Sequence, residues 1–339
     1  MSNNIIGIQK LSQQWGMENP FLFAAHHLEA YPKGNSEMGP AVSLAGRNIG
    51  SDFSGKDGFS MYHGSKIPGF PAHPHRGFET VTIAQTGLVD HFDSKGNEGR
   101  YGNGDVQWMT AGSGCQHNEM FPLVNQDKAN PMELFQIWLN LPAKNKFAEP
   151  DYTMLWAEDI PEFQVGANGK STTIRLIAGN FQGKESLRPN ASSWANDSNN
   201  HVGIFMLRME PESTIIFPAV SATLTRNLYY YRVNGFIQIE GQKISSSNRV
   251  KLQGNEAVTI TNGSEESFLL LLEGEPIQEP VVHYGPFVMN SEAEIRQAIH
   301  DYQQTEFGGW PWARHDEVHE RNAGRFARYS DGRFERRTP

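Results

Sequence analysis

Hydrophobic residues along this chain gather in short stretches separated by Gly, Asn, Ser and Pro, without the spacing of long amphipathic helices. In the first half, the strand-like stretches cover residues 19–23, 78–84, 88–93, 106–109 and 132–141. In the second half, they cover residues 172–178, 202–209, 213–217, 229–239, 257–261 and 267–272. Many short strands with closely spaced turns are typical of β-sandwiches and β-barrels. We therefore predict an all-β fold.

Four segments depart from this pattern. Residues 31–69 are rich in Gly, Ser, Asn and Lys without periodicity, which indicates a long surface loop. Residues 146–169 have a mixed composition with two prolines and are interpreted as a linker. Ser291 and Glu294 have the spacing of a capping box, which predicts a short helix to about Gln304. The polar chain after Trp312 predicts a solvent-exposed tail that is dispensable for folding, with a role in assembly left open.

Length and composition bound the class of protein. A chain of 339 residues is too long for one small core and fits two domains. The single cysteine, Cys115, permits no internal disulfide, and the N-terminus has no basic segment followed by an apolar one, so we expect a cytoplasmic protein. No apolar stretch is long enough to span a bilayer. A net charge of −9 argues against direct nucleic-acid binding, although regulation through a protein partner stays open.

Two short polar pairs between Pro71 and Phe121 are the candidate site: His73-Pro74-His75 and His117-Asn118-Glu119. In a strand, residues two apart point to the same face about 7 Å apart, so each pair presents two ligand groups in one direction. The glycines of Gly112-Ser113-Gly114 allow a sharp turn that brings the second pair over the first. Three imidazoles and a carboxylate leave coordination positions open, as in non-haem Fe(II) sites, whereas structural zinc prefers a closed tetrahedron.

Several neighbouring residues offer alternatives. Glu79 lies four residues after His75 and faces the same side if the strand is regular, so it could be a ligand, an acceptor for an imidazole N–H, or a general base. Arg76 is predicted to orient carboxylates as an ion-pair partner. Cys115 could share the face of His117, but a small buried apolar role is favoured. His26 and His27 are adjacent, so on a strand they face opposite ways and form no ligand pair.

Three strings, HPHRGFETVT, GDVQWMTAGSGCQH and EPVVHYGPFVMN, resemble the pirin family of the cupin superfamily, and the resemblance extends from about residue 19 to residue 312. It implies two face-to-face tandem cupin barrels of the double-stranded β-helix or jelly-roll type. The metal-binding barrel is expected at 19–150, a metal-free barrel at 165–309, and an Arg-rich tail at 310–339. The resemblance also implies one Fe(II) per chain, held by His73, His75, His117 and Glu119. Glu79 has the spacing at which many cupins place a carboxylate ligand and is kept as the alternative to Glu119.

The resemblance implies two classes of function. Some pirins resemble flavonol dioxygenases, which open quercetin-like substrates with O2 and release carbon monoxide, and others act as redox-dependent partners of transcription factors. We predict a quercetin 2,3-dioxygenase-like activity on a flavonol-like enediol or phenol, with Glu119 as both metal ligand and proton acceptor. The alternative is an interaction protein whose metal is a structural or redox switch. No His occurs between His201 and His283 and no similar pairs occur there, so we expect no metal in the second barrel.

Overall fold

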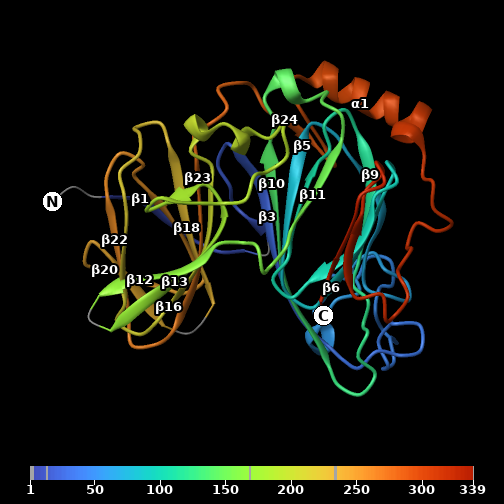
Figure 1. Cartoon of the computed structure of the whole chain (residues 1–339), viewed down its shortest axis with the longest axis horizontal. Coiled ribbons are helices and arrows are strands. Elements are labelled where there is room, and N and C mark those ends of the chain that lie inside the picture. Colours follow the sequence, from blue (N-terminus) through green and yellow to red (C-terminus); the bar gives the residue numbers. More distant parts are fainter. Residues whose placement is uncertain (1–3, 13, 168, 233–234, 339) are drawn as a thin grey trace. The chain divides into compact units, whose positions relative to one another are not determined.

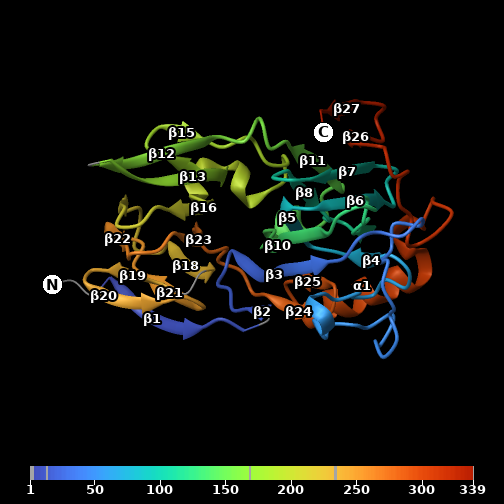
Figure 2. The ribbon, with the colours of Figure 1, turned by 90° about the horizontal axis from the view of Figure 1, so that it is seen from below.

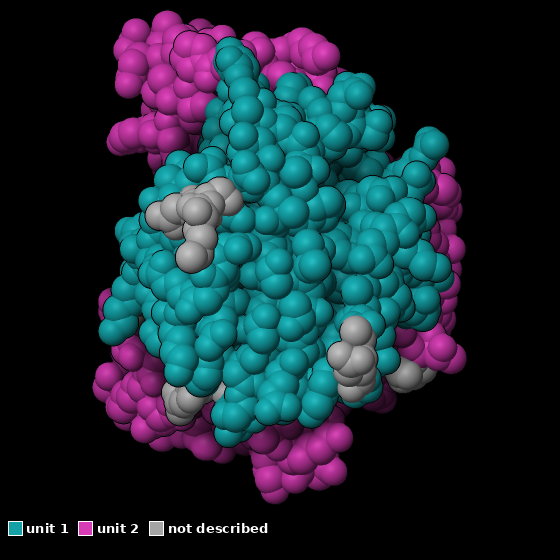
Figure 3. All heavy atoms as spheres, turned by 90° about the vertical axis from the view of Figure 1, so that its left-hand side faces the viewer, with its two compact units in different colours: residues 1–24, 158–278 teal, residues 25–157, 279–339 magenta. Residues whose placement is uncertain are grey.

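The structure is a computed structural model that describes residues 4–12, 14–167, 169–232 and 235–338. Within these ranges strands dominate, and the one α-helix is α1 (Glu292–Thr305), near the C-terminus (Figure 1). The chain divides into two compact units, which we call the site unit (25–157 and 279–339) and the second unit (1–24 and 158–278) (Figure 3). The expected domains at 19–150, 165–309 and 310–339 are continuous stretches of sequence, whereas each compact unit is built from two separate stretches.

Two antiparallel arrangements of strands build the site unit. One runs in the order β11 (Asp151–Leu155), β8 (Val106–Thr110), β5 (Phe78–Thr86), β10 (Asn130–Asn140), β3 (Phe21–Tyr31). The other runs in the order β27 (Phe334–Arg337), β26 (Arg325–Arg328), β7 (Glu98–Gly102), β6 (Leu88–Asp93), β9 (Cys115–Met120), β4 (Gly69–His75). A two-stranded ribbon, β24 (Val282–Tyr284) with β25 (Phe287–Met289), precedes α1. Aliphatic, aromatic and methionine side chains from several of these strands form a buried core.

The second unit is also antiparallel. Its larger sheet runs in the order β1 (Ile5–Lys10), β21 (Asn248–Leu252), β18 (Thr225–Arg232), β23 (Ser267–Gly274), β16 (Gly203–Met209), β13 (Lys170–Ala178), β12 (Glu162–Ala167). Its smaller sheet runs in the order β17 (Thr214–Phe217), β22 (Val258–Asn262), β19 (Phe236–Ile239), β20 (Gln242–Ser245). The short strands β14 (Asn180–Phe181) and β15 (Lys184–Glu185) pair with each other, and β2 (Gln14–Trp15) pairs with β3 at the end of its sheet. Apolar side chains from both sheets share one core.

The helix and most strands agree with the sequence predictions. The Ser291 hydroxyl accepts a hydrogen bond from the Glu294 amide (3.3 Å), so the predicted helix cap is confirmed. No helix among the described residues is long and apolar enough to cross a membrane. The predicted strand 229–239 is wrong as one element, because it divides into β18 and β19; positions 233–234 within it lie outside the described residues.

Three segments that were expected to be irregular have more structure than predicted. The prediction of a linker at 146–169 is wrong, because this segment contains β11, which pairs with β8, and β12, which pairs with β13. The loop 31–69 is largely irregular, but Phe59, Met61 and Tyr62 are buried in the core of the site unit. The predicted solvent-exposed tail is wrong in part: most of its residues are exposed or partly exposed, but β26 and β27 extend the sheet from β7 (Figure 2), and Phe326, Ala327 and Tyr329 are buried. In each case, buried aromatic or sulfur-containing side chains tie a polar segment to the core.

Candidate metal centre

The two predicted polar pairs lie on neighbouring strands. β4 and β9 are antiparallel, and their register places His73 opposite His117. The ring centroids lie 4.8 Å apart for His73 and His75, 4.6 Å for His73 and His117, and 5.0 Å for His75 and His117. One nitrogen from each ring can be chosen so that all three lie within 4.8 Å of one another. Within the described ranges, no other group of three or more His, Cys, Asp or Glu residues is placed to hold a metal.

The ring nitrogens of this triad have few hydrogen-bond partners. Neither nitrogen of the buried His75 or His117 has one among the described residues, although the Pro286 carbonyl lies near His75 and slightly favours its protonated form. His73 Nδ1 lies 2.9 Å from the Pro71 carbonyl, so a proton on Nδ1 leaves Nε2 as an acceptor. A buried polar atom without a partner costs about 1–3 kcal/mol, which makes these nitrogens a good fit for a cation.

Burial also sets the charge of the triad. It lowers the pKa of His73 to about 4, opposed by the hydrogen bond to Pro71. It holds the pKa of His75 and His117 well below the usual range, and the neighbouring imidazoles act in the same direction. All three rings are therefore neutral at physiological pH, which is the form that binds metals.

Glu119 lies beside the triad with both carboxylate oxygens engaged. Its Oε2 is 3.8 Å from His117 Nε2 and accepts a hydrogen bond from Gln136 Nε2 at 2.5 Å. Its Oε1 accepts a hydrogen bond from Thr82 Oγ1 at 3.0 Å. Burial raises the pKa of this carboxyl, opposed by Gln136, His91 and Thr82. The carboxylate is thus held by neutral donors close to the imidazoles.

Glu79 does not face the triad, so the expectation that it shares the face of His75 is wrong. Its Oε1 accepts hydrogen bonds from Trp108 Nε1 (3.0 Å) and Thr110 Oγ1 (2.7 Å). The alternate residues of β5, represented by Thr82, face Glu119 instead. The chain bends between the two strands: β4 ends at His75, and β5 enters a different sheet after Gly77, which has a φ of 86°. Because of this bend, the alternation of side chains on β4 does not continue into β5, and Glu79 faces away from His75. A Cβ at position 77 would lie 2.0 Å from the Val288 carbonyl oxygen, so only glycine fits this bend.

The other sequence candidates have structural roles. Arg76 is confirmed as an ion-pair partner, with Nη1 2.6 Å from Asp301 Oδ2 on α1 and Nε 2.7 Å from the Ser113 carbonyl. Cys115 is buried against Met109 and Ala111, and burial raises the pKa of its thiol. The two N-terminal histidines have different neighbours, as predicted: His26 lies 3.1 Å from Glu133 Oε1, and His27 Nδ1 lies 2.7 Å from the Tyr62 hydroxyl.

Sequence reasoning missed three residues around the site. Thr82 and Gln136 sit in predicted strands, but only the register shows that they hold Glu119. His91 is fully buried, lies opposite Glu119 in the β6–β9 register, and its ring centroid is 5.5 Å from that of His117. Its Nε2 lies 3.4 Å from Asp93 Oδ2. The period-two spacing of His91 and Asp93 on the predicted strand 88–93 was the available signal.

Aromatic rings flank the triad. The Phe78 and Trp138 ring centroids lie 5.0 and 5.4 Å from that of His75. The Phe70 ring centroid lies 6.3 Å from that of His73, and Phe70 stacks on Tyr62, from the loop 31–69, at 5.0 Å. Such surfaces suit a planar aromatic ligand.

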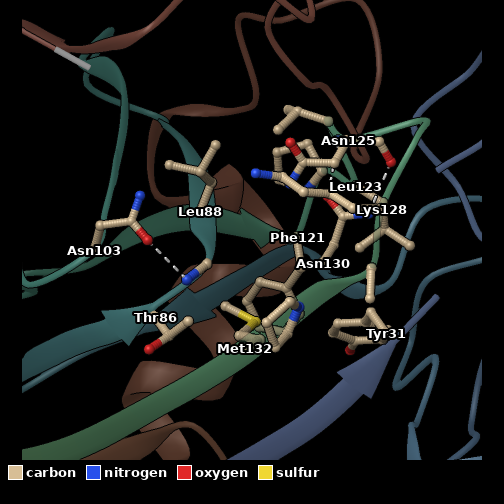
Figure 4. Close-up of a pocket in the computed structure, with 15 residues that line it drawn as sticks. Tyr31, Thr86, Leu88, Asn103, Phe121, Leu123, Asn125, Lys128, Asn130 and Met132 are labelled. Carbon is tan, nitrogen blue, oxygen red and sulfur yellow. Dashed lines mark hydrogen bonds between the residues drawn. The ribbon is translucent and has the colours of Figure 1, made fainter. Parts of the chain in front are cut away.

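A separate pocket of about 580 Å³ opens elsewhere on the site unit (Figure 4). Its lining includes the apolar side chains of Tyr31, Phe121 and Met132 and the polar side chains of Asn103 and Lys128. None of the predicted ligand residues lines it. Its nearest link to the candidate site in the sequence is Phe121, two residues after Glu119 on the chain that leaves β9.

Comparison with known families agrees with this geometry. The Pirin family model matches residues 10–139, and the model of the Pirin C-terminal cupin domain matches residues 204–308. The antiparallel strands, the clustered histidines and the two family matches thus define a protein of the cupin class, which confirms the predicted all-β fold of tandem cupins with a short C-terminal helix. The chain belongs to the pirin family.

Individual relatives extend the comparison. The chain is 38% identical over 239 residues to a Pseudomonas aeruginosa protein named "Putative quercetin 2,3-dioxygenase", covering 70% of this chain and 79% of the relative. It is 32% identical to the pirin of Homo sapiens over 256 residues, covering 74% of this chain and 81% of the relative. A crystal structure of quercetin 2,3-dioxygenase from Acinetobacter baumannii matches with a TM-score of 0.70 and 25% identity, covering 90% of this chain and 98% of that one.

Proposed function

We propose that this chain is an Fe(II)-dependent oxygenase that opens the central ring of a flavonol such as quercetin with O2. The observation that carries the proposal is the cluster of three neutral imidazoles beside the Glu119 carboxylate, in which the nitrogens of the buried His75 and His117 have no hydrogen-bond partner among the described residues. The names of the Pseudomonas and Acinetobacter proteins support the substrate class. The flanking rings of Phe78, Trp138 and Phe70 suit a flat polyphenol.

His73, His75, His117 and Glu119 are the residues that would hold the ion. A bound Fe(II) would supply open coordination positions and electron transfer with O2. The neutral imidazoles need no deprotonation before they bind a metal, because burial already keeps their pKa values low. We assign one ion to each chain. We also assign a cytoplasmic location, which is supported by a sequence with one cysteine and therefore no internal disulfide.

Glu119 is proposed to be the proton acceptor as well as a ligand. A flavonol must lose its hydroxyl proton to bind as an oxyanion, and a carboxylate within hydrogen-bond reach can take it. The raised pKa of the Glu119 carboxyl makes it a stronger base than an exposed one. We assign the proton to Oε2, the oxygen nearer to His117, while Thr82 keeps its hydrogen bond to Oε1.

The test is turnover with a defined metal. The proposed reaction consumes one O2 and one flavonol and yields one ring-opened ester and one carbon monoxide, so no further oxidant is needed. Apo protein loaded anaerobically with Fe(II), Ni(II), Cu(II) or Zn(II) should, after admission of O2, consume quercetin and O2 and release carbon monoxide in equal amounts. We expect the fastest turnover with Fe(II). Iron being the least active ion refutes the metal assignment, and no carbon monoxide with any ion refutes the oxygenase.

A further inference from the structure

Every residue of β9 that faces away from the candidate metal centre contacts a segment near the C-terminus. His117 and Glu119 face the candidate metal centre, so Gln116, Asn118 and Met120 face the other way. Gln116 accepts a hydrogen bond from the Tyr302 hydroxyl (3.1 Å) and donates one to the Glu306 carbonyl (2.9 Å). Asn118 Nδ2 donates to the carbonyls of residues 315 (3.3 Å) and 317 (3.0 Å). Met120 belongs to an apolar cluster against which Val318 packs.

The same segment contacts the strands on both sides of β9. At β4, the His315 carbonyl accepts a hydrogen bond from the Ala72 amide at 2.9 Å, one residue before His73. At β6, the Phe92 ring lies between Trp312 (4.8 Å) and His319 (4.2 Å), measured between ring centroids. Trp312 Nε1 also donates to the Asp93 carbonyl (2.7 Å), and Asp93 is the register partner of His117. We call residues 306–321 the C-terminal strap; Figure 1 shows the chain after α1 passing beside β9.

Two arginines, the buried Arg100 and the partly exposed Arg321, hold the far end of the strap. Arg100 forms an ion pair with Asp90 at 2.6 Å and donates from Nη1 and Nη2 to the carbonyls of residues 319, 320 and 321 at 2.9–3.1 Å. Arg321 in turn donates to the carbonyls of Val124 (2.7 Å) and Asn35 (2.6 Å). Charge-assisted bonds of this kind are stronger than neutral ones, so the strap is fixed to the sheet at its end as well as along β9.

We propose that the C-terminal strap fixes the position of the metal ligands on β9. Asn118 is the positioning residue, because it links the strap to the backbone between His117 and Glu119. This inference rests on the proposed function only in that the site must bind a metal. Asn118 lies between His117 and Glu119 on one strand, so a shift of its backbone displaces both neighbouring side chains. The Pirin models match residues 10–139 and 204–308, so nearly the whole strap lies beyond the matched region. The groups that orient metal ligands typically change metal affinity ten- to a hundredfold when they are removed.

The variant that removes this contact without changing the size of the side chain is Asn118→Asp. Asn118 Oδ1 accepts a hydrogen bond from the Phe92 amide at 2.9 Å, which an aspartate keeps, whereas both donor bonds to the strap are lost. The matched control is Glu317→Ala, because Glu317 contacts Asn118 through its carbonyl, which alanine retains. Co(II) is the probe: its affinity is measured by competition with a chelator, and its visible absorption bands report the geometry of the ligands.

We expect Asn118→Asp to weaken Co(II) binding by about tenfold to a hundredfold and to shift the absorption bands, with wild-type behaviour for Glu317→Ala. A merely structural role predicts a lower melting temperature of the metal-free protein with unchanged affinity and bands in the folded fraction, and that result overturns the inference. If Asn118→Asp does not fold, Trp312→Phe carries the test, because it keeps an aromatic ring beside Phe92 and removes the indole N–H bond to Asp93. We expect at least about threefold weaker binding there, and unchanged binding overturns the inference. A wild-type chain that binds no Co(II) overturns the proposed function and this inference together, whereas tight wild-type binding with unaffected variants overturns the inference alone.

Discussion

Replacing Phe326 with alanine tests whether the C-terminal extension, residues 322–339 with β26 and β27, contributes to the stability of the fold. Phe326 lies on β26, is 6% exposed, and its ring lies 4.8 Å from that of His319 between centroids. Truncating a buried phenylalanine typically costs about 3–5 kcal/mol, through lost burial and the cavity left behind. We expect about 3 kcal/mol here, the lower end of that range, because β26 is only one strand from the edge of its sheet and its surroundings can partly collapse. For a unit of this size that is a fall of about 6–12 °C in melting temperature.

The matched control is Phe334→Ala on the neighbouring strand β27. Phe334 is 48% exposed and its ring lies 5.9 Å from that of Phe326, so its removal is expected to cost at most about 1 kcal/mol. Both variants are measured in the metal-free form by calorimetry and by urea unfolding, which avoids any contribution from metal binding. Phe326→Ala should lower one transition only, because the second unit has its own core. Equal melting curves for wild type and Phe326→Ala would show that the extension is dispensable and refute the reasoning.

Three further predictions concern the site and its surroundings. Glu119→Gln should retain bound metal and lose turnover, Glu79→Gln should retain both, and His75→Ala should lose the metal. Elemental analysis measures the metal, and an oxygen-uptake assay measures turnover. Loss of turnover only in Glu79→Gln would make Glu79 the base. Elemental analysis of purified protein should find one metal per chain, since the second unit has no similar His and Glu pairs, and two ions that survive mild chelation contradict this. Burial, aided by His26, lowers the pKa of His27 from 6.5 to about 4. Between these two pH values the unfolded chain binds more protons than the folded chain, so the free energy of unfolding decreases as the pH falls from 6.5 to about 4. The loss is up to about 2 kcal/mol after allowance for partial exposure. Urea titrations of His27→Gln between pH 4 and pH 7 should show a shallower loss than wild type, and parallel curves contradict the assignment.

Local patterns in the sequence account for the elements of the site that depend on neighbouring residues. The pairs His73/His75 and His117/Glu119 were predicted because side chains two apart on a strand share a face, and the structure places the three imidazoles together. The helix start at Ser291 followed from one side-chain oxygen and one amide three residues later. The family strings supplied the tandem cupin fold, which neither composition nor periodicity could specify.

Only the tertiary structure determines the features that depend on contacts between residues far apart in the sequence. The direction of Glu79 was set by the bend at Gly77, because a strand that changes sheets does not keep the alternation of the strand before it. The hydrogen bonds from Thr82 and Gln136 to Glu119 needed the register of three strands. The polar C-terminal extension has little apolar periodicity, yet β26 pairs with β7, more than two hundred residues earlier. Such pairing satisfies backbone groups whatever the side chains are, so only the folded structure reveals which edge strand is available to accept it.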